Sequence, residues 1–195
     1  MLSPLYRNQF VKIIIDSSQL AGFLLESRCK KNIKLIVSTR LTLGSVDKRF
    51  LIKKNRDFKT GIVHIGLGNF HRAHLAVYTA IAMQESGGDW GVCAYTFRNH
   101  KLVESLKNQE NLYSVVEIYP NSEAISLPNV HTDFIAGYEN APLIIDRIGN
   151  ADTKIVSLTV TEAGYYIDNQ SGGIKWEDAD IENDRSGKSP RTIYG

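Results

Sequence analysis

Two glycines at a spacing of two residues, Gly66 and Gly68, offer the clearest chemistry in this sequence. They separate a short apolar, β-branched stretch from a segment with helical periodicity, the context that a dinucleotide-binding fingerprint requires. Gly66 would permit the tight turn, and Gly68 would let the backbone approach a pyrophosphate at the start of the helix. The pattern favours a nucleotide site, although a glycine turn that only joins a strand to a helix would look the same.

The third glycine of the usual pattern is missing, and His71 stands in its place. That glycine normally lets the helix pack closely on a strand. Small side chains on one helical face, at Ala73, Ala76 and Ala80, could allow the same close approach. We therefore expect a dinucleotide turn with a modified third position.

Three basic side chains crowd the same turn, at His71, Arg72 and His74. A zinc site would favour histidines four residues apart with a carboxylate nearby, whereas these two are three apart with none adjacent. We expect both histidines to pack as polar groups near the start of the helix, while Arg72 could face a phosphate. His64 lies inside an apolar strand and is expected to be a core residue.

The residues after the second strand should lie beside the adenosine ribose, where a carboxylate suits NAD and a cation suits the 2′-phosphate of NADP. Asp89 has the nominal spacing but precedes that strand, so it lies at the wrong end. The correct end carries Arg98 and Lys101 and no carboxylate. This favours NADP or mixed use, unless both cations only solvate the start of a helix.

Thr161 and Glu162 end the last apolar strand. Carboxyl ends of strands in open α/β sheets face the ligand crevice, so these residues are predicted to contact the nicotinamide side of a cofactor. Glu162 could handle or orient a proton there, or it could be an exposed loop carboxylate. Cys93, inside the second strand, is expected to be a small buried hydrophobe.

The elements that position these residues alternate between strand and helix. Apolar, β-branched stretches predict strands at 61–66, 90–97, 113–119, 123–127, 130–138 and 154–161, the third and fourth forming a hairpin. Helical periodicity predicts helices from His71 to Gly87 and at 98–109 and 139–148. The predicted fold class is α/β: a Rossmann-like, doubly wound, mostly parallel sheet with a β-hairpin insertion. From Gly172 onward the polar sequence is expected to be a long loop.

Composition excludes several classes of protein. The chain has 195 residues, of which 43% are hydrophobic and 23% charged, and a net charge of +2, which argues against a generically basic nucleic-acid binder. No stretch approaches the roughly 20 apolar residues that span a bilayer. Two cysteines cannot build a disulfide scaffold, so a reducing cytoplasm is the expected location, with neither membrane nor nucleic acid as a partner.

The near-neutral total hides a basic N-terminal part. Residues 1–58 hold 12 Lys and Arg against 4 Asp and Glu. Such a segment could be a nucleic-acid arm, a patch for anionic membranes or an organelle presequence, but we favour an extension or sequence foreign to the domain that follows. We expect residues 1–39 to be this basic extension and residues 40–195 to be a dinucleotide-binding domain truncated at its C-terminal end.

Several motifs together resemble the polyol-specific long-chain dehydrogenases, the mannitol dehydrogenase family. The leading one is Gly66-x-Gly68-x-Phe70-His71-Arg72-Ala73-His74. Further matches occur, in the expected order, at 89–93, 109–117, 155–162 and 190–192, so the likeness runs from about Thr60 to Gly195. Residues 1–39 resemble nothing in the family.

The resemblance implies an oxidoreductase that uses NAD or NADP, without a metal, to move a hydride between a polyol and a keto-sugar or hexuronate. It implies an N-terminal Rossmann domain followed by a mostly helical C-terminal domain that would bind the substrate. The family's cofactor segment falls on Ile62, Val63, His64, Ile65, Gly66, Leu67, Gly68, Asn69, Phe70, His71, Arg72 and Ala73.

Two departures from the family limit what this chain is expected to do. NAD-preferring members carry acidic residues after the second strand, where this chain has Asn99, His100 and Lys101. The family's general-base lysine and its partners lie beyond residue 195, so no catalytic residue is assigned. The expected function is the cofactor-binding part of a polyol dehydrogenase, inactive alone. The alternative is a non-catalytic NAD(P)-binding or regulatory module.

Overall fold

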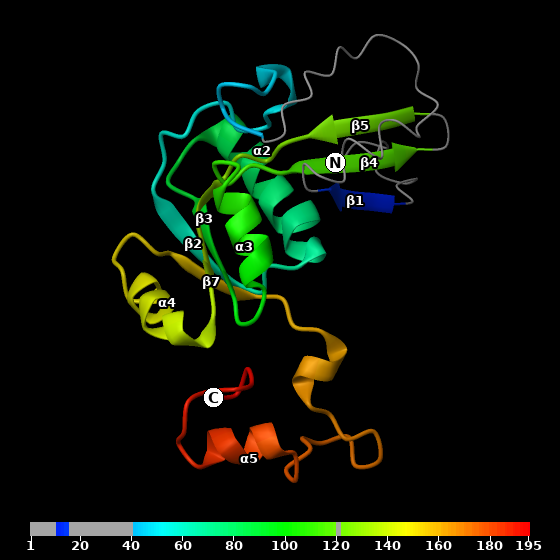
Figure 1. Ribbon diagram of the computed structural model, residues 1–195, viewed down its shortest axis with the longest axis vertical. Helices are drawn as coiled ribbons and strands as arrows, with labels where there is room; N and C mark the ends of the chain where they lie inside the picture. Colours follow the sequence, from blue (N-terminus) through cyan, green and yellow to red (C-terminus); the bar gives the residue numbers. More distant parts are fainter. Residues whose placement is uncertain (1–10, 16–40, 120–121) are drawn as a thin grey trace. The chain divides into compact units, whose positions relative to one another are not determined.

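The computed structural model describes residues 11–15, 41–119 and 122–195 (Figure 1). The chain forms two compact units, Met1–Leu158 and Thr159–Gly195, and each is described by itself. The first unit holds the glycine turn and the two sheets. The second unit holds the short helices near the C-terminus.

A four-stranded parallel sheet forms the centre of the first unit. Its strands are β2 (Thr60–Ile65), β3 (Gly91–Thr96), β6 (His131–Ala136) and β7 (Ile155–Leu158), in the spatial order β6-β3-β2-β7. Within this sheet β2 comes first in the sequence, followed by β3 beside it and β6 beyond β3. The chain then crosses to β7, which pairs with the other side of β2. The order therefore reverses between β2 and β7, and the predicted Rossmann-like parallel sheet is confirmed.

Helices cover both faces of this sheet. α2 (Ala76–Ser86) and α3 (His100–Lys107) pack on one face, and α4 (Ala141–Ile148) packs on the other (Figure 1). Alternate strand residues face opposite ways, as the period of two in a strand requires. On the α2–α3 face lie Ile62, Val92, Ala94, Phe134 and Ala136, and on the α4 face lie Val63, Cys93, Tyr95 and Ile135.

The helix predicted from His71 begins differently from the expectation. Its first residues, η3 (His71–Leu75), form a π-helix, in which the Ala76 N–H bonds to the His71 carbonyl, and α2 starts only at Ala76. Such π-turns inside helices are rare and frequently occur at functional sites. The predicted small face is confirmed, because Ala73, Ala76 and Ala80 are all buried.

An antiparallel sheet adds to this frame. The predicted hairpin is confirmed as β4 (Ser114–Tyr119) and β5 (Ser122–Ser126), while its turn at 120–121 lies outside the described residues. β1 (Val11–Ile15), from the segment expected to be a basic extension, pairs with the other side of β4. The rest of 1–39 lies outside the described residues. Next to the hairpin, buried Leu51 packs with Leu112 and Leu127, so the chain just after residue 40 joins the core.

The second unit corrects the prediction of a long loop after Gly172. It contains η5 (Glu162–Tyr165) and the helix α5 (Ala179–Arg185). The Asp178 carboxylate caps this helix by accepting from the Asp180 N–H at 2.9 Å, and Ile181 is buried. The density of charged side chains concealed the helix, because one cap and one buried apolar residue suffice to hold so short an element.

Candidate functional site

The glycine turn follows β2 at the carboxyl end of the parallel sheet, beside the point where the strand order reverses. Open α/β sheets bind their ligands at this place. Gly66 has φ +116°, a value that glycine adopts without the strain other residues would suffer, and its N–H donates to the Tyr95 carbonyl at 2.9 Å. The neighbouring strand β3 therefore holds the start of the turn.

Gly68 leaves open space above the turn. A Cβ placed on Gly68 would meet no heavy atom within 4 Å, and its carbonyl accepts from the Arg72 N–H at 3.2 Å as the helix begins. Crowding by the described residues therefore does not explain why glycine stands here. A ligand lying against the backbone would explain it, because it would need the space that a side chain would fill. This space fits the pyrophosphate of a dinucleotide, which approaches main-chain N–H groups closely.

The twelve residues expected to form the cofactor segment divide by exposure. Only Gly68, Asn69 and Phe70 are exposed, Phe70 by 65%. Ile65 and Gly66 are half-buried. The buried members are Ile62, Val63, His64, Leu67, His71, Arg72 and Ala73. The exposed and half-buried members can touch a ligand, whereas the buried ones can shape the turn or contribute their charge from within the fold.

His64 and His71 lie against each other beneath the turn. Their rings stack at a centroid distance of 3.8 Å and an interplanar angle of 13°. His64 also contacts the Gly66 carbonyl through Nε2 at 3.0 Å and the Ser157 hydroxyl through Nδ1 at 2.8 Å. The expectation that His64 is a core residue is confirmed by its burial, and its bonds tie β7 to the glycine turn.

A third buried imidazole, His131 at the start of β6, completes the cluster. Its Nε2 lies 3.0 Å from Nε2 of His71, and each ring keeps a buried Nδ1 without a hydrogen-bond partner among the described residues. Burial, followed by the charges of neighbouring basic groups, lowers the pKa of His71, and burial likewise lowers the pKa of His131 to about 3. Both imidazoles are therefore neutral at neutral pH.

Arg72 brings a positive charge to the turn from below. Its guanidinium donates to Oδ1 of Asn69 at 2.6 Å, and its carbonyl accepts from the Tyr113 hydroxyl at 3.1 Å. Burial raises the pKa of Tyr113, so its hydroxyl stays protonated as a donor. Arg72 therefore orients the exposed Asn69 side chain.

The carboxyl end of β3 carries the cations that bear on the choice of cofactor. Arg98 donates through Nε to the Tyr138 hydroxyl at 3.2 Å, and Lys101 is exposed in the first turn of α3. Asn99 caps α3 by accepting from the Leu102 N–H. Asp89 lies at the opposite end of the strand, where it accepts from the Lys59 N–H, as expected.

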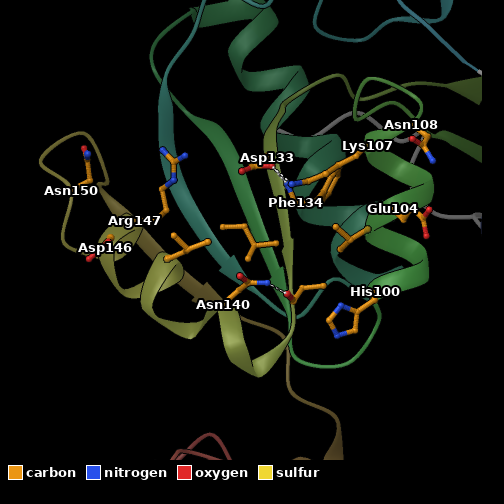
Figure 2. Close-up of a pocket in the computed structure, with 14 residues that line it drawn as sticks. His100, Glu104, Lys107, Asn108, Asp133, Phe134, Asn140, Asp146, Arg147 and Asn150 are labelled. Carbon is orange, nitrogen blue, oxygen red and sulfur yellow. Dashed lines mark hydrogen bonds and ion pairs between the residues drawn. The ribbon is translucent and has the colours of Figure 1, made fainter.

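A groove with a volume of about 850 Å³ runs along the outer edge of β6, between α3 and α4. Figure 2 shows the side chains that line it. Across its floor Lys107 pairs with Asp133 at 3.1 Å. At the carboxyl end of β6 the groove is lined by His100, Ala136 and Asn140, and Ala136 pairs with Thr96 at the end of β3. Neither Arg98 nor Lys101 lines it, and the glycine turn is not part of it.

The remaining predicted site residues, Thr161 and Glu162, belong to the second unit. Thr161 precedes η5, Glu162 is the first residue of η5, and both side chains are exposed. In the described part of the chain no group of three or more His, Cys, Asp or Glu could hold a metal ion. Within the same residues, no helix is long and apolar enough to cross a membrane.

Three partners of the turn could not be found from the sequence: His131, Ser157 and Tyr113. His131 and Ser157 lie 60 and 93 residues from the histidines they contact, so no local spacing connects them. Tyr113 stands in a segment that also carries the resemblance, but nothing in that motif points to the Arg72 carbonyl. Only the fold brings these side chains under the turn.

Comparisons with known proteins identify the family. Residues 60–194 match the model of the mannitol dehydrogenase Rossmann domain. The chain is 36% identical over 149 residues to a mannitol 2-dehydrogenase of Aspergillus clavatus, covering 73% of this chain and 30% of the relative. It is 33% identical over 172 residues to that of Neosartorya fischeri, covering 85% and 34%.

Solved structures agree with this assignment. Mannitol 2-dehydrogenase of Pseudomonas fluorescens, in a ternary complex with NAD and D-mannitol, superposes with a TM-score of 0.67 at 32% identity, covering 74% of this chain and 30% of that one. A D-sorbitol dehydrogenase in substrate-free form gives 0.63 at 27% identity, covering 79% and 31%. The chain thus spans about a third of the length of the relatives it matches. It belongs to the mannitol dehydrogenase family and carries that family's Rossmann domain.

Proposed function

We propose that this chain binds the pyrophosphate of a nicotinamide dinucleotide on the turn from Gly66 to Phe70. The observation that carries the proposal is the open space at Gly68, beside the reversal of strand order. The NAD complex of the Pseudomonas fluorescens relative supports it, because that protein shares the fold at 32% identity. Gly66, Gly68 and Asn69 would line the phosphates, and the buried cation of Arg72 would add favourable charge.

We further propose that the whole protein interconverts a polyol with a keto-sugar or hexuronate. The bound nicotinamide would supply the hydride chemistry. Residues 40–195 would form the cofactor domain, and a C-terminal part like that of the longer relatives would bind the substrate and supply the base. These 195 residues alone would bind cofactor with little turnover. Its buried, unpaired thiol at Cys93 suits a reducing compartment such as the cytoplasm.

The second half of the dinucleotide is proposed to lie at the end of β3. Arg98 and Lys101 would face the adenosine ribose there, and two cations without a carboxylate favour the 2′-phosphate of NADP. Arg98 is held by Tyr138, so Lys101 is the freer of the two to turn toward a phosphate. On the nicotinamide side, Thr161 and Glu162 remain the proposed contacts.

The experiment is a titration of the full 195-residue chain with NADH and NADPH, followed by protein fluorescence. Wild type should bind both saturably, and Gly68→Val should bind neither, because the new side chain fills the space left for the pyrophosphate. Since a Cβ at Gly68 meets no described heavy atom within 4 Å, the variant should melt at a temperature no lower than wild type. Equal affinity in wild type and Gly68→Val would refute the site. Absence of binding to wild type would refute the proposed function.

A further inference from the structure

The hydrogen bonds of His64 fix the position of its proton. Its Nε2 lies 3.0 Å from the Gly66 carbonyl oxygen. A carbonyl only accepts, so Nε2 must carry the proton and donate. Burial lowers the pKa of His64, so the ring is neutral at neutral pH. Its Nδ1 is then an acceptor, and the Ser157 hydroxyl, 2.8 Å away, donates to it. The geometry thus selects one tautomer of a buried, neutral imidazole.

This arrangement fixes Gly66 on both sides. Its N–H donates to the Tyr95 carbonyl of β3, and its own carbonyl accepts from His64. The chain of donors runs from Ser157 on β7, through His64 on β2, to the first glycine of the turn. It therefore crosses the place where the strand order reverses, and it sets the peptide planes that lead to Gly68.

His71 supports the same ring from the helix side. Glycine usually occupies this third position and lets helix and strand approach closely. Here the flat His71 ring lies on the His64 ring at 3.8 Å, and a hydrogen bond to His131 holds its far edge. The stacked imidazoles thus provide the close contact between helix and strand that a glycine at the third position usually allows.

We propose that His64, as the Nε2–H tautomer held by Ser157, is a positioning residue that fixes the Gly66–Gly68 turn for the pyrophosphate. The inference rests on the proposed function, since it names what orients that same site. His64 is only 1% exposed, so it acts through the Gly66 carbonyl and not by touching the ligand. A residue that merely filled the core could be replaced by any side chain of similar volume.

The test compares His64→Gln with His64→Leu in the full chain, titrated with NADH. The glutamine amide presents one acceptor and one donor at about the spacing of the two ring nitrogens, whereas leucine presents neither. We expect His64→Leu to bind NADH about tenfold more weakly than wild type and His64→Gln to stay within about threefold. Ser157→Ala, at a half-buried site, should fall between them and carries the test if His64→Leu does not fold. Wild-type affinity in the leucine variant, or equal losses in both variants, would overturn the inference.

Two readouts judge the inference without any cofactor. Nitrogen NMR of the free chain should show His64 protonated at Nε2 and bare at Nδ1. Amide hydrogen exchange at Gly68, Asn69 and Phe70 should accelerate in His64→Leu and not in His64→Gln. A proton on Nδ1, or unchanged exchange in the leucine variant, would overturn the inference even where NADH binds. Failure of wild type to bind NADH would instead refute the proposed function.

Discussion

The buried imidazoles make the stability of this chain depend on pH in a calculable way. Burial lowers the pKa of His131 to about 3, and the nearby basic groups His64, Arg72 and Arg56 act in the same direction. In the unfolded chain the ring would titrate near its usual value of about 6.5. Because the folded pKa is the lower one, the unfolded state takes up the proton first as the pH falls. Stability is therefore full above about pH 7 and is lost progressively toward the folded pKa.

The magnitude follows from that difference. Between pH 7 and pH 5 a single histidine that protonates only on unfolding lowers the free energy of unfolding by about 2 kcal/mol. Burial first, and then neighbouring basic groups, also lower the pKa of His71, so the pair should contribute about 4 kcal/mol. That is a large part of the roughly 5–15 kcal/mol by which a domain is stable.

The assay is urea unfolding at half-unit steps between pH 5 and pH 7.5, for wild type and for His131→Gln. Glutamine can still donate to Nε2 of His71 but does not titrate, so the variant should lose about 1 kcal/mol per pH unit less than wild type between pH 6 and pH 5. The carboxylates of both chains are the same and cancel in the comparison. Equal pH slopes in the two proteins would refute the assignment of His131 as a buried neutral group.

Three further outcomes follow from the structure. Gly68→Ala should raise the free energy of unfolding by about 0.5 kcal/mol, because its Cβ meets open space and the unfolded chain loses freedom, while NADH affinity falls; thermal melts and titrations measure the two effects. Lys101→Asp should shift the ratio of NADPH to NADH affinity toward NADH by roughly tenfold, measured by parallel titrations. Val156→Lys should reduce concentration-dependent association in sedimentation, because β7 is an edge strand with Ile155, Val156 and Leu158 exposed.

Each of these predictions has a result that would contradict it, and the Lys101 variant also has a matched control. If Gly68→Ala gains stability and keeps full NADH affinity, the pyrophosphate does not lie against Gly68. Lys107 lies on the same helix but forms an ion pair with Asp133, so Lys107→Asp should leave the ratio of NADPH to NADH affinity unchanged. An equal shift in both variants would mean that the shift reflects the overall charge of the protein and not a contact of Lys101 with the 2′-phosphate. Equal association of Val156→Lys and wild type would show that the β7 edge does not mediate the association.

The parallel sheet was predictable because each of its strands has a clear local pattern of residue types. The stretch from Gly61 to Gly66 is apolar and β-branched, and it ends in the glycine that the turn needs. The helix after it was predictable in its small face but not in its π-helical start. The π-helical segment covers only five residues, too few to change the apolar period of the helix that follows, and the contacts of His71 lie far away in sequence.

The candidate site was predictable in its main chain and not in its support. Glycine spacing pointed to Gly66 and Gly68 because the conformational freedom of glycine can be read from the residue type itself. The tie from Ser157 to His64 and the bond from His71 to His131 depend on which strands become neighbours. In the C-terminal unit, α5 escaped prediction because Ile181 is its one buried residue and its cap lies among many similar carboxylates.

We propose above all that the glycine turn, at the reversal of strand order, holds the phosphates of a nicotinamide dinucleotide. The most direct measurement is the change in backbone amide NMR shifts of the 195-residue chain on addition of NADH. We expect the largest changes on the amides from Gly66 to Arg72, with smaller ones at the ends of β3 and β7. Changes centred on the groove between α3 and α4, or none at saturating NADH, would contradict it.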